Sequence, residues 1–377
     1  MAVQAQPQPA AGTRYYLRPL GRLTRPPGLI NAAPDRMVRI GGRADTVFSA
    51  FELIERHASG WIDRRVVSVD EARQLLAMPG PLGSRLKTTM AHFTAPRSAI
   101  ANLPLDRPRI MGIVNVTPDS FSDGGSFKTP KDAVAHALRL EEEGAELLDI
   151  GGESTRPGAD PVTVDEELRR IMPVLEGLRG KTRARISVDT RRADVMRRAA
   201  SAGAHILNDV SALMYDPQSL RVATETKLPI VLMHAQGEPA TMQKDPQYAD
   251  ALLDVFDHLE ARVEACVRAG VARERLILDP GIGFGKTVLH NLEIMGGLSL
   301  LHGLGAAVML GASRKSFIGA LSGAIDPKDR VMGSVAAALS GAMQGAQILR
   351  VHDVAATRQA LTIWQATTIG AAATTAL

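Results

Sequence analysis

The sequence has little cysteine. One of its 377 residues is cysteine, Cys266, so the chain cannot form an internal disulfide, and a cysteine-based metal site is excluded. Cys266 lies in a helical pattern with Leu259 and Val263, which is typical of a buried, small hydrophobic side chain. We therefore expect a protein that works in a reducing compartment, the cytoplasm.

A long apolar segment is also missing. No run approaches the roughly 18 apolar residues that a membrane span requires, and residues 1–12 lack the charged start and apolar middle of a secretory signal. Before Asp35 the chain has arginines and no acidic residue, as organelle transit peptides do, but the prolines between residues 7 and 27 oppose the amphipathic helix of such a peptide. We expect no membrane partner.

Neither sign of charge is strongly in excess. Lysine and arginine together number 44 and aspartate and glutamate 40, which leaves a net charge of +4. A small, dispersed excess of this kind is compatible with an anionic ligand and does not predict nucleic-acid binding. We expect small molecules as partners and no nucleic acid.

Eight short apolar runs recur along the chain, and each ends in small polar residues before a helical pattern begins. Parallel strands joined by crossover helices have this rhythm. Eight such units over about 265 residues predict the α/β class and a (β/α)8 TIM barrel. The runs occupy 110–114, 147–150, 186–190, 205–209, 230–234, 276–281, 307–311 and 346–350.

The remaining residues predict an N-terminal α+β extension. We expect a disordered start over 1–12, an extension of unknown role over 13–106, the barrel over 107–370 and a frayed tail over 371–377. Within the extension, the pattern indicates a short strand over 15–20, helical spacing over 46–57, and a helix that begins at the capping-box residue Ser68. The extension is interpreted as a lid or packing element, with a separate binding module as the alternative.

Polar residues gather at the ends of the predicted strands. Since the carboxyl ends of barrel strands meet at one mouth, we expect these side chains to converge there. Any one of them alone is explained by a helix cap or a buried hydrogen bond, but the set as a whole is not. The set is Asn115, Asp149, Thr155, Asp189, Asn208, His234, Asp279, Arg350 and His352.

Two kinds of chemistry meet at this mouth. Asp189, Asn208 and Asp279 suit a flat heterocycle whose edge carries parallel N–H donors. Lys315, Arg350, His352 and the glycine-rich turns suit an oxyanion or a phosphate. Phe284, placed between glycines, is suited to stacking on a ring. The sequence therefore predicts a ligand with a polar-edged ring at one end and an anion at the other.

The motifs N-V-T-P-D-S-F-S-D-G-G, G-G-E-S-T-R-P-G, S-V-D-T, N-D-V-S, D-P-G-I-G-F-G-K, S-R-K-S and R-V-H-D follow one another between residues 109 and 365. In this order they resemble the dihydropteroate synthase family of pterin-binding enzymes. The resemblance implies a transferase of folate biosynthesis that condenses (7,8-dihydropterin-6-yl)methyl diphosphate with 4-aminobenzoate to give 7,8-dihydropteroate and diphosphate. It also implies Mg²⁺ as a cofactor, and we expect a homodimer.

The resemblance further implies roles for single residues. Asp189, Asn208 and Asp279 would hold the pterin edge, with Lys315 bonding the ring system and Met233 lining its pocket. Asn115 would ligate Mg²⁺, while Thr155, Arg350 and His352 would grip the diphosphate. Pro157, Phe284, Lys315 and Ser316 would shape the aminobenzoate pocket, and Asp119, Phe121 and Arg156 would lie on loops that close over the reacting groups. Asp119, Lys315 and Arg350 are the expected catalytic residues.

Two alternatives remain open beside this interpretation. A pterin-binding methyltransferase would share the barrel and the Asp-Asn-Asp edge but would not need the cationic half, which is present here. A non-catalytic relative would show damage in the loops or the anion-binding residues, and none is found. One departure from the family pattern is Ala235, where methionine is frequent; we interpret it as a packing change.

Overall fold

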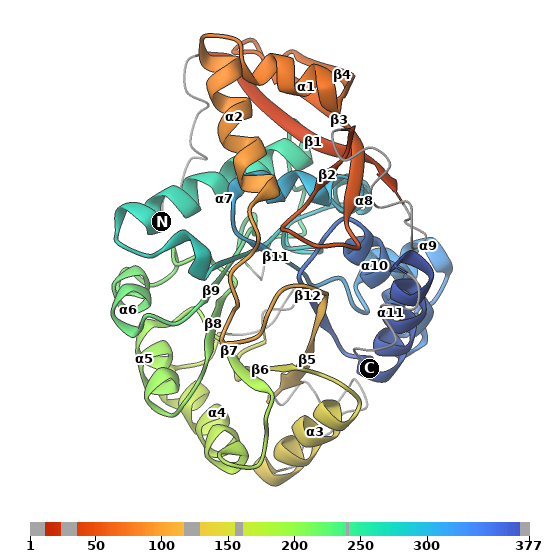
Figure 1. The fold of residues 1–377 in the computed structure, drawn as a ribbon. Coiled ribbons are helices and arrows are strands. Elements are labelled where there is room, and N and C mark those ends of the chain that lie inside the picture. Colours follow the sequence, from red (N-terminus) through yellow and green to blue (C-terminus); the bar gives the residue numbers. More distant parts are fainter. Residues whose placement is uncertain (1–11, 24–35, 117–128, 155–160, 239–240, 370–377) are drawn as a thin grey trace.

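The computed structural model describes residues 12–23, 36–116, 129–154, 161–238 and 241–369. At its centre is a closed barrel of eight parallel strands, in which each strand pairs with the next along the chain and the last with the first (Figure 1). This arrangement confirms the predicted (β/α)8 barrel. The strands are β5 (Arg109–Asn115), β6 (Leu147–Gly151), β7 (Arg185–Asp189), β8 (Ile206–Asp209), β9 (Ile230–Met233), β10 (Leu276–Asp279), β11 (Ala307–Leu310) and β12 (Ile348–Val351).

Alternation along the strands divides the barrel wall into an outer and an inner face. Outward residues such as Leu148 and Val188 pack in the large cluster beneath the helices. Inward residues near the amino ends are apolar and form a floor: Met111, Leu147, Ile206, Val231, Ile277, Met309 and Ile348. Two residues further along the same strands, the inward positions are Ile113, Asp149, Asn208, Met233, Asp279 and, on β12, Arg350. The interior therefore changes from an apolar floor to a polar upper layer.

Helices connect successive strands and surround the barrel (Figure 1). Several begin where the sequence supplies a capping side chain: the side chains of Thr129, Thr163 and Asp250 each accept a backbone N–H of the first helical turn. The helices are α3 (Pro130–Glu142), α4 (Val164–Leu178), α5 (Ala193–Ser201), α6 (Ser219–Thr226), α7 (Ala251–Arg268), α8 (Val288–Gly296), α9 (Ser316–Ser322), α10 (Val331–Met343) and α11 (Val354–Ile369), with short 3₁₀ helices η4 (Arg273–Arg275), η5 (Leu298–Leu304) and η6 (Pro327–Arg330).

The chain before the barrel forms an antiparallel sheet with two helices. Strand β3 (Val47–Arg56) pairs with β1 (Arg14–Leu23) on one edge and with β2 (Val38–Arg39) and β4 (Ile62–Ser68) on the other. Helices α1 (Val69–Leu76) and α2 (Pro81–Thr94) follow. The strand expected over 15–20 is confirmed within β1. The helix expected from Ser68 is confirmed as α1, with the Ser68 hydroxyl accepting the Glu71 N–H.

The helical spacing predicted over 46–57 is wrong, because this segment is the central strand β3. Phe51 and Leu53 pack with α1 and α2 on one face of the sheet, whereas Ile54 belongs to the core of the barrel. Because both faces of the strand are buried, its apolar residues do not alternate with polar ones, and the period of two is hidden.

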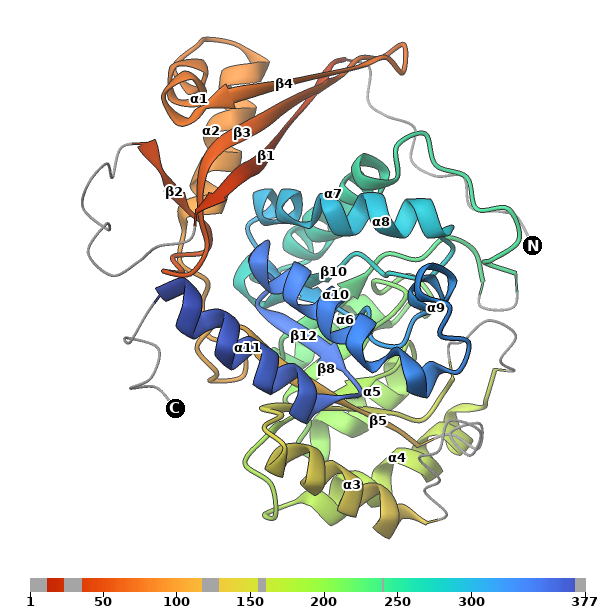
Figure 2. The ribbon, with the colours of Figure 1, turned by 90° about the vertical axis from the view of Figure 1, so that its right-hand side faces the viewer.

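The extension lies on the flank of α7 and at the amino ends of the barrel strands, on the side away from the strand ends that carry the polar layer (Figure 2). The Tyr16 hydroxyl donates to the Asp257 carboxylate of α7 at 2.9 Å. The Arg43 guanidinium donates to the carbonyls of Gly345 and Ala346, which precede β12, at 3.2 and 2.9 Å. In the described part of the extension these contacts support the packing role, and the lid role stays a prediction.

The connection between the extension and the barrel closes the barrel floor. Ile100 and Leu105 are buried in the same apolar cluster as Met111 and Ile348. Ile100 and Leu103 exchange two backbone hydrogen bonds, of 3.0 and 2.8 Å, which hold this connection in a compact turn. Solvent is thus excluded from the lower barrel, and the upper layer is the part of the barrel left open to a ligand.

Candidate active site

A cavity of about 530 Å³ opens at the carboxyl ends of the barrel strands. Strands supply the inner part of its wall and the loops that follow them supply the rim. The lining includes Ile113, Asn115, Glu153, Ser154, Asp189, Asn208, Val210, Met233, Met242, Gln243, Asp279, Gly281, Gly283, Phe284, Gly311, Ser313, Arg314, Lys315, Ser316, Pro327, Arg350 and His352. Volume and mixed lining suit a drug-sized ligand with a few fixed polar contacts.

Arg350 stands at the centre of the polar layer and is held by two carboxylates. Its Nε donates to Asp149 Oδ2 at 2.7 Å and its Nη2 to Asp189 Oδ2 at 3.1 Å. Asn208 Nδ2 donates to the same Asp149 oxygen at 3.0 Å. Asp149 is fully buried, while the side chains of Arg350 and Asp189 retain 19% and 13% exposure to the cavity. The two carboxylates thereby fix the orientation of the Arg350 guanidinium, and part of this group stays exposed to a ligand in the cavity.

The electrostatics of this layer follow from burial and close charge. Burial and the neighbouring Asp149 carboxylate raise the pKa of Asp189, and Arg350 opposes the rise. Burial also raises the pKa of Asp279, against the Gly281 N–H, Lys315 and Arg350. For Arg350 the two carboxylates outweigh burial and raise its pKa, so it is cationic at any ordinary pH. Hydrogen-bond donors on a ligand would favour the ionised forms of Asp189 and Asp279.

The loop after β10 brings an aromatic ring against a cation. The Lys315 Nζ lies 4.1 Å from the centre of the Phe284 ring, and a Cβ on Gly283 would come 3.2 Å from Lys315 Cδ. Asp279 Oδ1 accepts the Gly281 N–H at 2.7 Å, while the Gly283 N–H is bound by Asn291 Oδ1. Because those N–H groups already have acceptors, this turn contributes a wall with an aromatic face, and the anion-binding role predicted for it is not supported.

His352 and Asn115 lie on the rim at the ends of two neighbouring strands, β12 and β5. His352 Nδ1 lies 3.0 Å from the Ser313 hydroxyl, which also accepts the His352 backbone N–H at 3.2 Å. Asn115 ends β5, and a Cβ on Gly151 would lie 3.5 Å from Asp189 Cβ and 3.7 Å from Asn115 Oδ1. The absence of a side chain at Gly151 therefore leaves room between Asn115 and Asp189.

The structure brings most of the predicted site residues to the wall of one cavity. Those residues are Asn115, Asp189, Asn208, Met233, Asp279, Phe284, Lys315, Ser316, Arg350 and His352. Asp119, Phe121, Thr155, Arg156 and Pro157 lie outside the described residues. His234, also expected at the mouth, is instead buried behind the wall, where burial and the nearby Lys286 and His258 hold its pKa well below the usual range.

Sequence reasoning missed a buried ion network beside the cavity. The Glu153 carboxylate accepts from Arg191 and Arg192, at 3.0 and 2.8 Å, and Arg192 also pairs with Glu167 at 2.6 Å. The two arginines outweigh burial and lower the pKa of Glu153. Glu153 lies in the motif G-G-E-S-T-R-P-G and Arg191 directly follows S-V-D-T, so the rule that found the other residues applied to them as well.

Sequence reasoning also missed a buried lysine behind the cavity, Lys286. Its position at the end of the D-P-G-I-G-F-G-K motif was visible, but its burial was not.

Among the described residues, no group of three or more His, Cys, Asp or Glu side chains is arranged to hold a metal ion. Nor does any helix in the described part of the chain combine the length and apolarity needed to cross a bilayer.

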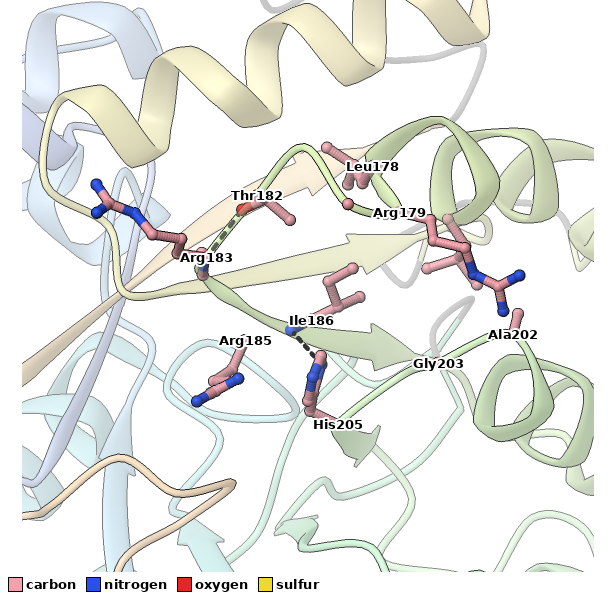
Figure 3. A pocket seen from close by; sticks show the side chains of 12 residues that line it. Leu178, Arg179, Thr182, Arg183, Arg185, Ile186, Ala202, Gly203 and His205 are labelled. Atoms are coloured by element: carbon pink, nitrogen blue, oxygen red, sulfur yellow. Dashed lines mark hydrogen bonds between the residues drawn. The ribbon is translucent and has the colours of Figure 1, made fainter.

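A smaller cavity of about 180 Å³ lies at the opposite end of β7, between α4 and α5. Arg179, Arg183 and Arg185 are in its lining, and the Ile186 N–H donates to His205 Nδ1 at 3.1 Å (Figure 3). The guanidinium groups of Arg179 and Arg183 point to opposite sides (Figure 3). Since these cations do not converge, the cavity does not form an anion site.

The barrel part of the chain is similar to known pterin-binding enzymes. Residues 111–352 match the family described as "Pterin binding enzyme". The dihydropteroate synthase of Escherichia coli K12 is 47% identical over 266 residues, which cover 71% of this chain and 94% of that protein. The Xanthomonas albilineans dihydropteroate synthase with 4-aminobenzoic acid is 53% identical, with a TM-score of 0.66 over 70% of this chain and 94% of that chain. A structure of that enzyme in complex with 7,8-dihydropteroate is 49% identical, with a TM-score of 0.65 over 72% of this chain and 98% of that chain.

Proposed function

The chain belongs to the dihydropteroate synthase family of pterin-binding enzymes, and from this premise we propose which of its residues carry the reaction. It is a transferase of a pterin-methyl group, joining (7,8-dihydropterin-6-yl)methyl diphosphate to 4-aminobenzoate with release of diphosphate. The observation that carries the assignment of residues is the meeting of Asp279 and Arg350 in one cavity, because the substrate has an N–H-rich ring at one end and an anion at the other.

The pterin ring is assigned to the acidic side of the cavity. Asp189, Asn208 and Asp279 present acceptors, and the Asn208 amide is oriented by its bond to Asp149. A carboxylate accepts two parallel N–H groups from a guanidine-like edge, which is the pattern that a pterin offers. Met233 lines the same wall and is 4% exposed, so it contributes apolar contact beside the ring.

The diphosphate is assigned to the cationic side. Arg350 and His352 lie on the cavity wall, and Thr155 is proposed to join them. Lys315, which faces Phe284, is proposed to bond the pterin ring system. Mg²⁺ would be held by Asn115 together with diphosphate oxygens, and when bound it neutralises charge on the leaving group. A single amide oxygen fits this role because Mg²⁺ in such sites keeps water and phosphate ligands. Arg350 stabilises the charge that develops on the same leaving group.

The aminobenzoate is assigned to the pocket of Phe284, Lys315 and Ser316, with Pro157 as a proposed further wall. Its amine attacks the pterin methylene as the bond to diphosphate breaks, and the amine loses one proton to the medium. A neutral arylamine is already nucleophilic, so the chain must orient the ring and exclude water. Asp119, Phe121 and Arg156 are proposed to close over these groups, with the Asp119 carboxylate steadying positive charge on the pterin.

Assembly and location are proposals of the same kind. Exposed apolar side chains on α8, α9, α10 and the turn between α9 and η6 gather on one side of the barrel, where the three helices lie next to one another (Figure 2). We propose that this face forms the homodimer: Leu289, Leu321, Ile325 and Met332 are 75, 60, 88 and 81% exposed. We propose a cytoplasmic location from the single buried thiol, and a division into the extension over 13–106 and the barrel over 107–370.

One assay tests the function directly. Purified protein is incubated with the pterin methyl diphosphate, radiolabelled 4-aminobenzoate and Mg²⁺, and labelled pteroate is separated and counted. We expect turnover that requires both substrates and stops when Mg²⁺ is chelated. Pterin binding without pteroate formation, under conditions in which the Escherichia coli relative is active, would contradict the assignment and favour a non-catalytic pterin-binding protein.

A further inference from the structure

Lys286 is a buried lysine whose contacts are made almost entirely with backbone. It is 3% exposed, and its Nζ lies 2.9 Å from the carbonyl oxygens of Gly281 and Phe284. The same atom lies 2.9 Å from His234 Nδ1 and 3.3 Å from the His234 carbonyl oxygen. Burying a lysine carries a large desolvation cost. Here the groups around Nζ that offset this cost are three carbonyl oxygens and an imidazole nitrogen.

The turn over residues 281–285 needs such a donor because it packs backbone against backbone. Gly281 and Gly285 have φ of +67° and +61°. A Cβ on Gly281 would lie 1.9 Å from the His234 carbonyl oxygen, and one on Gly285 would lie 2.2 Å from that of Gln236. At this approach the carbonyls of Gly281, Phe284 and His234 turn toward one another in the interior. The Lys286 amine satisfies them together.

The same turn forms the aromatic wall of the site. Phe284 faces Lys315 Nζ at 4.1 Å, and Gly283 lies against the Lys315 stem. Lys286 is itself outside the cavity lining, whereas Gly281, Gly283 and Phe284 are in it. A change at Lys286 therefore reaches the ligand through the position of this turn.

We propose that Lys286 is a positioning residue for the transfer reaction: its Nζ ties the turn over 281–285 to the end of β9 and so holds Phe284 and Lys315 in the geometry that receives the arylamine. The role of Lys286 in the reaction rests on the proposed function, whereas its attachment of the turn to β9, called the tie below, does not. Both protonation states of the amine carry the two N–H groups that Gly281 and Phe284 require. His234, which is neutral, adapts because its Nδ1 accepts from an ammonium and donates to an amine.

The first test compares Lys286→Met with the wild type. Methionine retains most of the side-chain length and removes every donor. We expect the KM for 4-aminobenzoate to rise about tenfold or more, as for the loss of a net hydrogen bond or two, with a smaller change in kcat. Lys181→Met, at an exposed position far from the cavity, is the matched control and should leave both constants unchanged. A Lys286→Met enzyme with the wild-type KM would overturn the proposal.

A second test separates the donor from simple packing. Lys286→Ala removes a propylamine-sized group, so added propylammonium should restore a low KM for 4-aminobenzoate, while tetramethylammonium, which has no N–H, should not. Rescue by both cations, or by neither, contradicts a role as a donor. These comparisons use the variant and its rescue in the same protein preparation, which removes differences in folding yield.

A third measurement needs neither a variant nor turnover. Burial lowers the pKa of Lys286 to about 7, with Asp279 acting to raise it and Lys315 to lower it; His234 contacts it, and His258 and His290 sense its charge. The pKa in the closed turn lies below the ordinary lysine value, so opening should become harder as pH rises above 7.

The amides of Gly283 and Phe284 report this opening by hydrogen exchange. Their protection, corrected for intrinsic exchange, should rise up to tenfold per pH unit between pH 7 and pH 9, while that of the amides of Leu232 and Leu278 in the neighbouring strands should not. Protection of the turn amides that does not change over this range would overturn the tie. Absence of pteroate synthesis in the wild type would instead count against the proposed function and leave this measurement intact.

Discussion

Arg350 shows how a single side chain in this site acquires its direction. Alternation along β12 turns it into the barrel, and the two carboxylates at 2.7 and 3.1 Å fix its guanidinium. A flexible cation in the same place would lose side-chain entropy on gripping a diphosphate, and part of that cost is here met before the ligand arrives. Lys315 Nζ lies over the Phe284 ring, 4.1 Å from its centre, and its charge acts to lower the pKa of Asp279, so the two cations are held in different surroundings.

Replacement of Lys315 by alanine should reduce the reaction, and it should cost less stability than replacement of Arg350, whose guanidinium is held by two carboxylates. We expect kcat/KM for pteroate formation to fall about a hundredfold or more, since a cation on the ligand is lost. Unfolding by urea should occur at a higher midpoint than for Arg350→Ala. Near-normal rates for a folded Lys315→Ala protein would contradict the role assigned to this residue.

Replacement of Arg350 by alanine should affect both properties. Asp149 and Asp189 would be left as neighbouring buried carboxyl groups without their counterion, which costs about 3 kcal/mol or more of the free energy of unfolding. Pteroate formation should be lost together with diphosphate binding. Urea unfolding followed by circular dichroism gives the stability, and a midpoint equal to that of Lys315→Ala would show that the ion pairs do not contribute as described.

At the scale of elements, the turn after β10 depends on glycine at a point of contact. Gly281 has a positive φ and lies against the His234 carbonyl. Gly180 has a similar φ of +70° but nothing within 4 Å of its missing Cβ. Alanine at Gly180 would therefore meet only the cost of the left-handed backbone conformation, whereas alanine at Gly281 would also bring its Cβ into the His234 carbonyl oxygen.

We expect Gly180→Ala to lower the free energy of unfolding by about 1 kcal/mol, the cost of the left-handed conformation. Gly281→Ala should cost about 3 kcal/mol or more, because the turn must also move away from β9, and it should raise the KM for 4-aminobenzoate. Thermal unfolding and steady-state kinetics of the pair test this. Equal destabilisation by the two substitutions would mean that the contact with His234 relaxes without consequence.

Elements differ in how well their sequences predict them. The barrel strands were predictable because each is a short apolar run followed by polar residues and a helical pattern. Strand β3 was not, because the extension buries one face against α1 and α2 and the other against the barrel. Its helix-like spacing of Phe48, Phe51 and Ile54 is a result of that double burial. The helix α1, in contrast, was predicted from Ser68, a cap that acts locally.

At the scale of the whole molecule, the extension is attached to the barrel through an interface on α7 that combines ion pairs with apolar packing. Asp257 accepts from the Tyr16 hydroxyl and pairs with Arg14 at 2.9 Å. The Tyr16 ring packs edge-on against Phe256 at 5.4 Å. Burial raises the pKa of Asp257 to about 6, aided by Glu260 and opposed by Arg14, Arg56 and the Tyr16 hydroxyl.

This shift predicts a pH-dependent contribution to stability. The pKa of Asp257 in the folded protein lies above the value of about 3.9 for an aspartate in an unfolded chain. Asp257 therefore makes its full contribution to the free energy of unfolding below pH 4, and this contribution is lost as the pH rises through 6. Between pH 4 and pH 7 the wild type should therefore lose up to about 3 kcal/mol of its free energy of unfolding relative to Asp257→Asn. Urea titrations at several pH values measure it. A difference that is constant over this range would show that Asp257 titrates normally.

The sequence alone determined the barrel, the identity of the polar residues at its mouth and the two-ended character of the ligand. These features depend on local rules: the period of two along a strand, the crossover helix, and the placement of strand ends at one mouth. Ten of the predicted site residues line the cavity for this reason.

Only the tertiary structure decided which of these groups touch. The pairing of Arg350 with Asp149, the burial of Lys286 among carbonyls and the attachment of the extension to α7 each join residues through space from separate strands, turns or helices. Such contacts depend on barrel closure and on the loss of solvent around each group. No pattern along the chain records either of these, so they appear only when the chain is folded.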